Sequence, residues 1–294
     1  MTTMENQSVL SKYKRQPKIY MQLPSNGKFY VDNPVEKSGS GELPIYSMTA
    51  KDELAIKTPD ALMSGESTVQ VIQSCCPLIS DPWGMPTVDL DAVLIAIRIA
   101  TYGEVLDMEV PIQYQEGKEV KIAKETTQVD LRQVLDSMQG KEWPTEFKLG
   151  ELTFHLRPLT YKESTNFFMT TFENQRLAQV MQDSKVDDAQ KLQAFKEGFK
   201  KLSQMTLDMI VKHVVAIETP DGTENNPSAI KDFFDNTDKD TFVAVQERLE
   251  SIKDEWTAPP KRFKVPDEYV EKGAHEYLDV PLVFDNSSFF VRKS

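Results

Sequence analysis

The feature that most restricts how this chain can fold is a helix that is apolar on nearly all sides. The segment DLDAVLIAIRIATYG runs from Asp89 to Gly103, and glycine is common where helices end. Apolar side chains recur at helical spacing on one side and also fill another: Leu90, Val93, Leu94 and Ile97, then Ile95, Ile99 and Tyr102. A helix without a polar face is usually buried. We therefore expect residues 88–102 to form the core of the first half of the chain.

Two motifs precede this helix. The first, LPSNGKFY at 23–30, indicates a turn, because Pro24 fixes one dihedral and Asn26 and Gly27 accept a positive φ. The second, ELPIYSMTAKDELAI at 42–56, predicts a strand over 44–48 that leads directly into a helix. Thr49 is the expected N-cap of that helix, with Asp52 three residues further on.

The series LPSNGKFY, MTAKDE and AIRIATYG, in this order and separation, resembles the baseplate hub subunit and hub-assembly family of T4-like contractile-tailed phages. The resemblance covers about the first third of the chain. It implies a non-enzymatic part or assembly factor of a phage tail baseplate. Its partners would then be other hub or tail proteins, with a homo-oligomer as a further expectation.

Composition excludes several classes of protein. The chain has 294 residues, of which 39% are hydrophobic and 27% charged, as in soluble globular proteins with sizeable cores. Its net charge of −12 argues against nucleic acid as a partner, because phosphate binding needs clustered Lys and Arg. No apolar run is long enough for a membrane span, and no secretory signal is present. Adjacent Cys75 and Cys76 favour a reducing compartment. The resemblance implies that this is the bacterial host cytoplasm during assembly, with the virion tail baseplate as a later location.

The sequence predicts an α+β fold that is mainly α-helical, a helical bundle with an inserted small antiparallel β subdomain. We divide it into five segments: an extended N-terminal arm and turn (1–44), a helical core (45–103), an inserted β-hairpin subdomain (104–160), a helical bundle (161–256) and an extended C-terminal strap (257–294).

The predicted β subdomain consists of two hairpins. VLDMEVPIQY and EVKIAKETTQV alternate in polarity and are joined by QEGK, and FKLGELTFHLRPL contains a turn at Gly150. The last strand leads into Thr160 and Glu163, which form a capping box like that of Thr49 and Asp52. The repeated design suggests two strands lying side by side, or two independent uses of a common cap.

The predicted bundle contains helices over 162–182 and 187–218, a short helix after Asn226, and a final helix. The second carries an apolar stripe at three- and four-residue steps, and so does the final one: Leu192, Phe195, Phe199, Leu202, Met205 and Met209, then Phe242, Val245, Leu249, Ile252 and Trp256. Core packing is the favoured use of these stripes, and a partner helix is the alternative.

Two terminal segments are predicted to bind partners. The strap is rich in proline yet carries aromatic residues that a solvated tail does not need, so it either packs back on the bundle or anchors a neighbouring subunit. The arm is the one locally basic segment of the chain. The predicted partner-binding residues are Phe284, Phe289, Phe290, Lys12, Lys14, Arg15 and Lys18.

No pattern in the sequence indicates catalysis. The three histidines, His155, His213 and His275, have no second His or Cys at ligand spacing, and nucleotide-binding and nucleophile motifs are missing. We therefore expect no enzyme activity, cofactor or metal. The leading hypothesis is a structural subunit or assembly chaperone of the baseplate hub. The alternatives are a phage-encoded regulator of a host protein and an unrecognised hydrolase.

Overall fold

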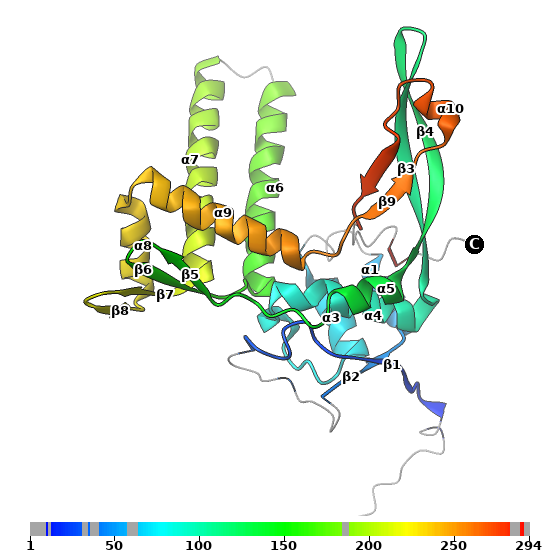
Figure 1. Cartoon of the computed structure of the whole chain (residues 1–294), viewed down its shortest axis with the longest axis horizontal. Coiled ribbons are helices and arrows are strands. Elements are labelled where there is room, and N and C mark those ends of the chain that lie inside the picture. Colours follow the sequence, from blue (N-terminus) through cyan, green and yellow to red (C-terminus); the bar gives the residue numbers. More distant parts are fainter. Residues whose placement is uncertain are drawn as a thin grey trace, which may run out of the picture.

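The computed structural model describes residues 10, 13–30, 35, 41–57, 64–183, 188–282 and 289–290, with the backbone alone for 177–183, 188–192 and 194. Two projections rise from a central body, one made of helices and one of strands (Figure 1). Within the described ranges, no helix is long and apolar enough to cross a membrane.

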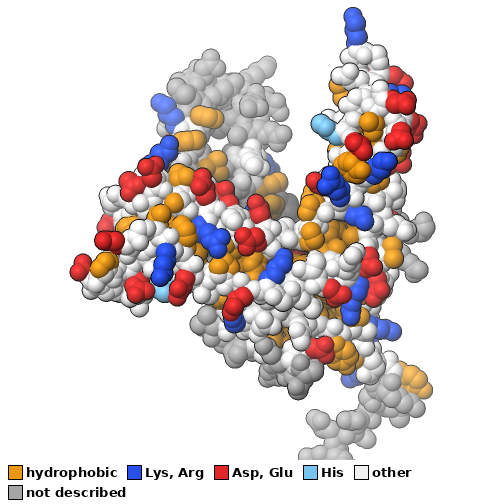
Figure 2. Space-filling model, viewed as in Figure 1, with side chains coloured by type: hydrophobic (Ala, Val, Ile, Leu, Met, Phe, Trp, Pro, Cys, Tyr) orange, Lys and Arg blue, Asp and Glu red, His pale blue; other side chains and the backbone are white. Residues whose placement is uncertain are grey.

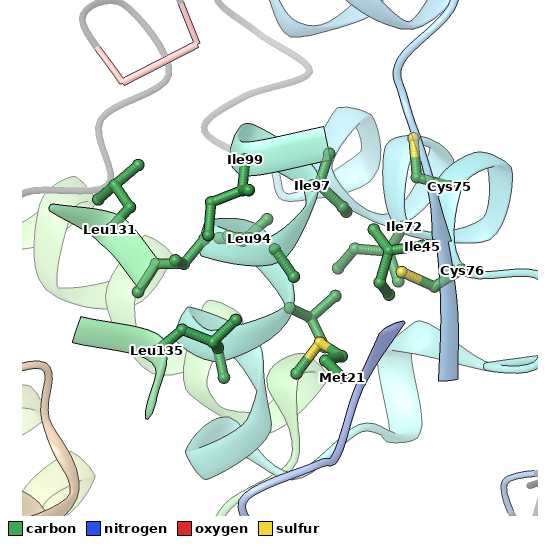
Figure 3. Close-up of a cluster of buried hydrophobic side chains, with 14 of the residues drawn as sticks. Met21, Ile45, Ile72, Cys75, Cys76, Leu94, Ile97, Ile99, Leu131 and Leu135 are labelled. Atoms are coloured by element: carbon green, nitrogen blue, oxygen red, sulfur yellow. The ribbon is translucent and has the colours of Figure 1, made fainter. Parts of the chain in front are cut away.

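The central body is built around helix α4 (Thr87–Tyr102), which confirms the predicted buried helix. Strands β1 (Pro17–Met21) and β2 (Leu43–Tyr46) pair antiparallel beside it. Helices α1 (Ala50–Ile56), α3 (Glu66–Cys75) and α5 (Leu131–Ser137) and the 3-10 turn η2 (Pro82–Gly84) complete the body. Figure 3 shows side chains from α3, α4, α5 and both strands meeting in one apolar cluster.

The predicted turn at 23–30 is confirmed, and a buried carboxylate holds it in place. Asn26 and Gly27 have the expected positive φ. Asp89 on α4 is fully buried and accepts hydrogen bonds from the Ser25 amide (2.8 Å) and hydroxyl (2.5 Å) and from the Tyr30 hydroxyl (3.0 Å). The first motif and the apolar helix are therefore joined by polar contacts inside the core.

The helical projection rests on a four-stranded antiparallel sheet in the order β5 (Glu146–Leu149), β6 (Leu152–Leu156), β7 (Val214–Thr219), β8 (Gly222–Glu224). Helices α6 (Tyr161–Asp183) and α7 (Asp188–His213) form an antiparallel pair. Helices α8 (Pro227–Asn236) and α9 (Lys239–Trp256) pack at the base of the helical projection. In Figure 1, α9 crosses in front of α6 and α7. A second apolar cluster joins this sheet to α7, α8 and α9.

The strand projection is the hairpin of β3 (Val105–Glu116) and β4 (Glu119–Asp130), which pair along their whole length. A second hairpin, β9 (Lys261–Lys264) and β10 (Tyr277–Val280), packs against it together with the short helix α10 (Asp267–Val270). Both hairpins share a small third core around Val110, Ile112 and Val265.

The prediction of a mainly helical bundle with one inserted β subdomain is wrong. The protein has mixed α and β structure with several small sheets. The helix predicted over 187–218 ends at His213, and the next six residues form β7, which pairs with β6. The four strands predicted as one subdomain, β3 to β6, lie in two different sheets. Strands β5 and β6 belong to the sheet that contains β7, whereas β3 and β4 form their own hairpin and pack on β9 and β10. The division into five segments remains a prediction.

Both predicted capping boxes are present. Thr49 and Asp52 exchange hydrogen bonds at the start of α1, and Thr160 and Glu163 do so at the start of α6. The strands before them do not lie side by side, because β2 pairs only with β1 whereas β6 lies between β5 and β7. The two junctions are therefore independent uses of the same cap.

Candidate protein-protein interface

The predicted aromatic anchor lies inside this chain. Phe289 and Phe290 are buried in the central core, with ring centroids 4.9 Å apart in an edge-to-face arrangement. The buried Arg98 of α4 donates from Nε to the Phe289 carbonyl oxygen at 2.8 Å. The observed contacts are those of a tail that packs back on its own chain. Phe284 lies outside the described residues, and a partner-binding role for these phenylalanines remains a prediction.

The basic arm is divided between solvent and the central body. Lys14 and Lys18 are exposed, and Lys12 lies outside the described residues. The Arg15 guanidinium is half-buried: it donates to the Ser74 hydroxyl at 2.8 Å and lies 3.6 Å from the Asp52 carboxylate. Arg15 thus ties β1 to the start of α1 and the end of α3, and Lys14 and Lys18 are the described lysines of the arm that face solvent.

Sequence reasoning favoured core packing for an apolar stripe that is partly exposed on α7, beside further exposed rings on α6. Figure 2 shows hydrophobic side chains on this projection above the line of α9. Four phenylalanines there are exposed: Phe168 (58%), Phe172 (37%), Phe195 (70%) and Phe199 (66%). The sequence signal was present, because Phe195 and Phe199 belong to the predicted stripe of α7, for which a partner helix was the alternative to core packing. The lower part of that stripe is half-buried, whereas Phe195 and Phe199 are exposed.

Helix geometry places these four rings on one side of the hairpin. The Thr171 hydroxyl of α6 lies 3.7 Å from the Met205 sulfur of α7, which marks the sides on which the two helices face each other. At 100° per residue, each phenylalanine lies about 60–120° around its helix axis from Thr171 or Met205. The rotation has the same sense in all four when each helix is followed from its N-terminus to its C-terminus. Because antiparallel helices wind in opposite directions as seen from one end, this rotation brings all four to the same face. We call Phe168, Phe172, Phe195 and Phe199 the aromatic face.

The opposite face of the hairpin has a different character. A groove of about 500 Å³ lies there, lined by residues that include Phe167, Met205, Glu197, Lys200 and Lys201. Its charges have both signs, and Asp208 at its lower end pairs with Lys231 of α8. The hairpin therefore has an aromatic face and a mixed-charge face.

The strand projection carries a second, smaller apolar patch near its tip. Val120 and Ile122 on β4 are 66% and 61% exposed. Lys121 lies between them, and Lys124, two residues after Ile122, pairs with Glu109 across the hairpin. Charged residues at these positions are typical of strands whose edges are protected from unspecific pairing.

A cavity of about 540 Å³ lies between the 23–30 turn and the sheet, lined mainly by apolar groups such as Phe29, Leu156 and Val215. Its cation Arg157 is already committed, because it binds both carboxylate oxygens of Glu163 at 2.7 and 2.8 Å. The His155 ring stands between Glu146 (3.9 Å) and Glu218 (3.5 Å).

Burial also shifts the pKa of three titratable groups outside this cavity. Burial raises the pKa of the Cys75 thiol to about 12 and that of Cys76 well above its usual value, so both thiols stay protonated and poorly nucleophilic. Burial lowers the pKa of His213, whose Nδ1 donates to the Arg157 carbonyl oxygen at 2.9 Å. Among the described residues, no group of three His, Cys, Asp or Glu side chains is placed to hold a metal ion.

Two projections with exposed apolar side chains are typical of a protein that docks to other proteins. A family model for the T4 bacteriophage base plate protein matches residues 16–259. The chain therefore belongs to that family, which confirms the resemblance to T4-like baseplate proteins. A search of curated proteins and of solved structures found no match. Membership indicates a structural role in the phage tail, with other tail proteins as partners.

Proposed function

We propose that this protein works without catalysis in the baseplate hub, where it joins other baseplate or tail proteins through direct contacts. It acts either as a structural subunit that remains in the virion or as an assembly chaperone in the host cytoplasm. The aromatic face is the observation that carries this proposal, because four exposed phenylalanines on one projection are costly in water unless a partner covers them.

The test is a pull-down of the tagged chain from phage-infected cells, with the same antibody applied to purified virions. Recovery of tail proteins from the lysate together with signal in virions identifies a structural subunit. Recovery from the lysate without signal in virions identifies an assembly chaperone. Failure to recover any tail protein contradicts the proposal and favours the regulator of a host protein.

A pair of variants connects the result to the aromatic face. Phe168→Ser with Phe172→Ser removes two exposed rings from α6, and we expect much less recovered tail protein with an unchanged fold. Leu54→Ser on α1 is the matched control, because Leu54 is 69% exposed but lies on the central body. Equal recovery with both variants would separate the function from this face.

The basic arm is a second proposed contact, with a salt-dependent contribution. Lys14→Glu with Lys18→Glu reverses the two exposed charges and leaves the Arg15 contacts intact. Partner binding should weaken most at low ionic strength, where exposed charges are least screened. Binding that is unchanged across a salt series would remove the arm from the interface.

A further inference from the structure

The aromatic face has the length and shape of a helix-binding site. Counting along α6 and α7 from the contact between Thr171 and Met205, Phe168 and Phe195 lie about 20 Å apart along the hairpin axis. This corresponds to about 13 residues of a third helix lying along the hairpin. The backbone of both helices is internally hydrogen-bonded, so this face offers no free strand edge. Side-chain packing must cover it, and a third helix lying along the pair does so as in a helix bundle.

Two positive side chains border the aromatic face among those that the structure describes. Arg176 lies one turn beyond Phe172 on α6, and Lys196 lies one turn before Phe199 on α7, so each borders the ring next to it. Both are exposed, and neither forms an ion pair with a residue in the described ranges. Of the acids with described side chains beside them, Glu197 lines the groove on the opposite face, and Glu173 is not within one helical turn of Phe168 or Phe195 and borders Arg176 instead.

These borders oppose a second copy as the occupant. Two aromatic faces brought together would place Arg176 and Lys196 of each copy beside those of the other, and like charges at close range are unfavourable. The whole chain has a net charge of −12, so two copies also repel each other over longer distances. The positive border instead complements negative charge on a different protein.

We propose that the aromatic face binds an amphipathic helix of another protein, with apolar residues along one side and acidic residues flanking them. The inference rests on the proposed function, because it names the kind of partner that the baseplate contact requires. The apolar side of the partner helix lies over the four rings, and its acidic flanks lie beside Arg176 and Lys196.

The test uses the full chain and two synthetic helical peptides of about 18 residues, long enough to cover the face. The peptides share their apolar positions and differ only in their flanks, which are Glu in one and Lys in the other. Fluorescence anisotropy measures both affinities at about 150 mM salt and at higher salt. We expect the Glu-flanked peptide to bind about tenfold more tightly or better, with a preference that declines as salt is added.

Three variants locate the site. Arg176→Glu with Lys196→Glu should remove or reverse the preference. Lys200→Glu with Lys201→Glu makes the same change in net charge on the opposite face and should leave the preference in place. Phe195→Ser with Phe199→Ser should weaken both peptides by about tenfold or more, because the shared apolar contact is lost. Circular dichroism confirms that each variant is folded.

Several outcomes would overturn the inference: equal affinity for the two peptides, no binding of either one, or a preference that only the Lys200 and Lys201 variant alters. Self-association that Phe195→Ser with Phe199→Ser abolishes would identify a second copy as the occupant. Binding to anionic lipid vesicles through the same residues would identify a membrane surface. If tail proteins are recovered from infected cells but the peptides are not distinguished, the inference fails while the proposed function stands.

Discussion

At the scale of single residues, the fold stabilises the charge of one carboxyl group, that of Glu163, and penalises the charge of another, that of Asp91. Glu163 receives two hydrogen bonds from Arg157 and one from the Thr160 amide. Burial of Asp91 on α4 raises the pKa of its carboxyl group to about 6. The two carboxyl groups should therefore affect stability in opposite directions as pH changes.

Replacing Asp91 should stabilise the protein at neutral pH. Its pKa is higher in the folded than in the unfolded chain, so the folded state favours the protonated form and loses stability as pH rises from about 4 to about 6. Asp91→Asn removes this penalty and should add about 1–3 kcal/mol above pH 6. Urea unfolding at several pH values measures the difference, which should shrink towards zero near pH 4. A gain that is the same at all pH values would contradict this cause.

Replacing Glu163 should have the opposite pH dependence. Burial by itself raises the pKa of this carboxyl group. The hydrogen bonds from Arg157 and the Thr160 amide lower the pKa by more than burial raises it, so the pKa falls to about 2. A depressed pKa contributes stability above the unfolded value, near 4.5, and loses it as pH falls towards 2. Glu163→Gln should therefore cost about 1–2 kcal/mol at pH 7 and progressively less below pH 4.5. Thermal unfolding of both proteins at matched pH gives the comparison, and a cost that grows on acidification would refute the assignment.

At the scale of elements, local signals in the sequence were sufficient to predict those elements whose structure depends on neighbouring residues of the chain. The buried helix, the 23–30 turn and both capping boxes depend on residues within a few positions of each other. The end of α7 depends on a distant partner. The apolar residues of the predicted stripe continue through His213 into Val214 and Ile217, and pairing with β6 makes the latter two part of a strand. Local periodicity does not contain that information.

The same limit explains why the sequence left the use of the α7 stripe open between core packing and a partner helix. A periodic stripe shows that one side of a helix is apolar, but it does not show what covers that side. On α9 the stripe is covered, since Val245, Ile252 and Trp256 are buried. On α7 the upper part of an equally regular stripe is open. The contact between Arg98 and Phe289 joins residues 191 positions apart, so the sequence likewise left open whether the strap packs on its own chain or anchors a neighbouring subunit.

Two phenylalanines in one projection should respond very differently to the same substitution. Phe154 on β6 is fully buried among Phe147, Phe233 and Phe234, so Phe154→Ala should cost about 3–5 kcal/mol. Phe199 on α7 is 66% exposed, so Phe199→Ala should change stability by no more than about 0.5 kcal/mol. Chemical denaturation of the two variants measures both values. A large loss in Phe199→Ala would mean that the aromatic face packs within its own chain.

At the scale of the whole molecule, the two ends of the described chain meet in one core. Met21 and Leu23 from the N-terminal region and Leu282, Phe289 and Phe290 from the C-terminal region belong to the same buried cluster around α4. The central body is therefore completed only when the last residues are in place. The helical projection has its own cluster, formed from the sheet and helices between residues 143 and 256 together with Val88.

This arrangement predicts that loss of the C-terminal rings weakens one part of the molecule more than the other. Phe289→Ala with Phe290→Ala removes two buried rings from the central cluster, and each loss should cost about 3–5 kcal/mol if the effects add. Hydrogen exchange followed by mass spectrometry should then show faster exchange in α4, which packs against these rings, and little change in α9, whose apolar stripe belongs to the other cluster. Equal acceleration in both helices would show that the two clusters unfold as one unit. No acceleration in α4 would show that the rings contribute little to the core, and the prediction that they anchor a neighbouring subunit would then be favoured.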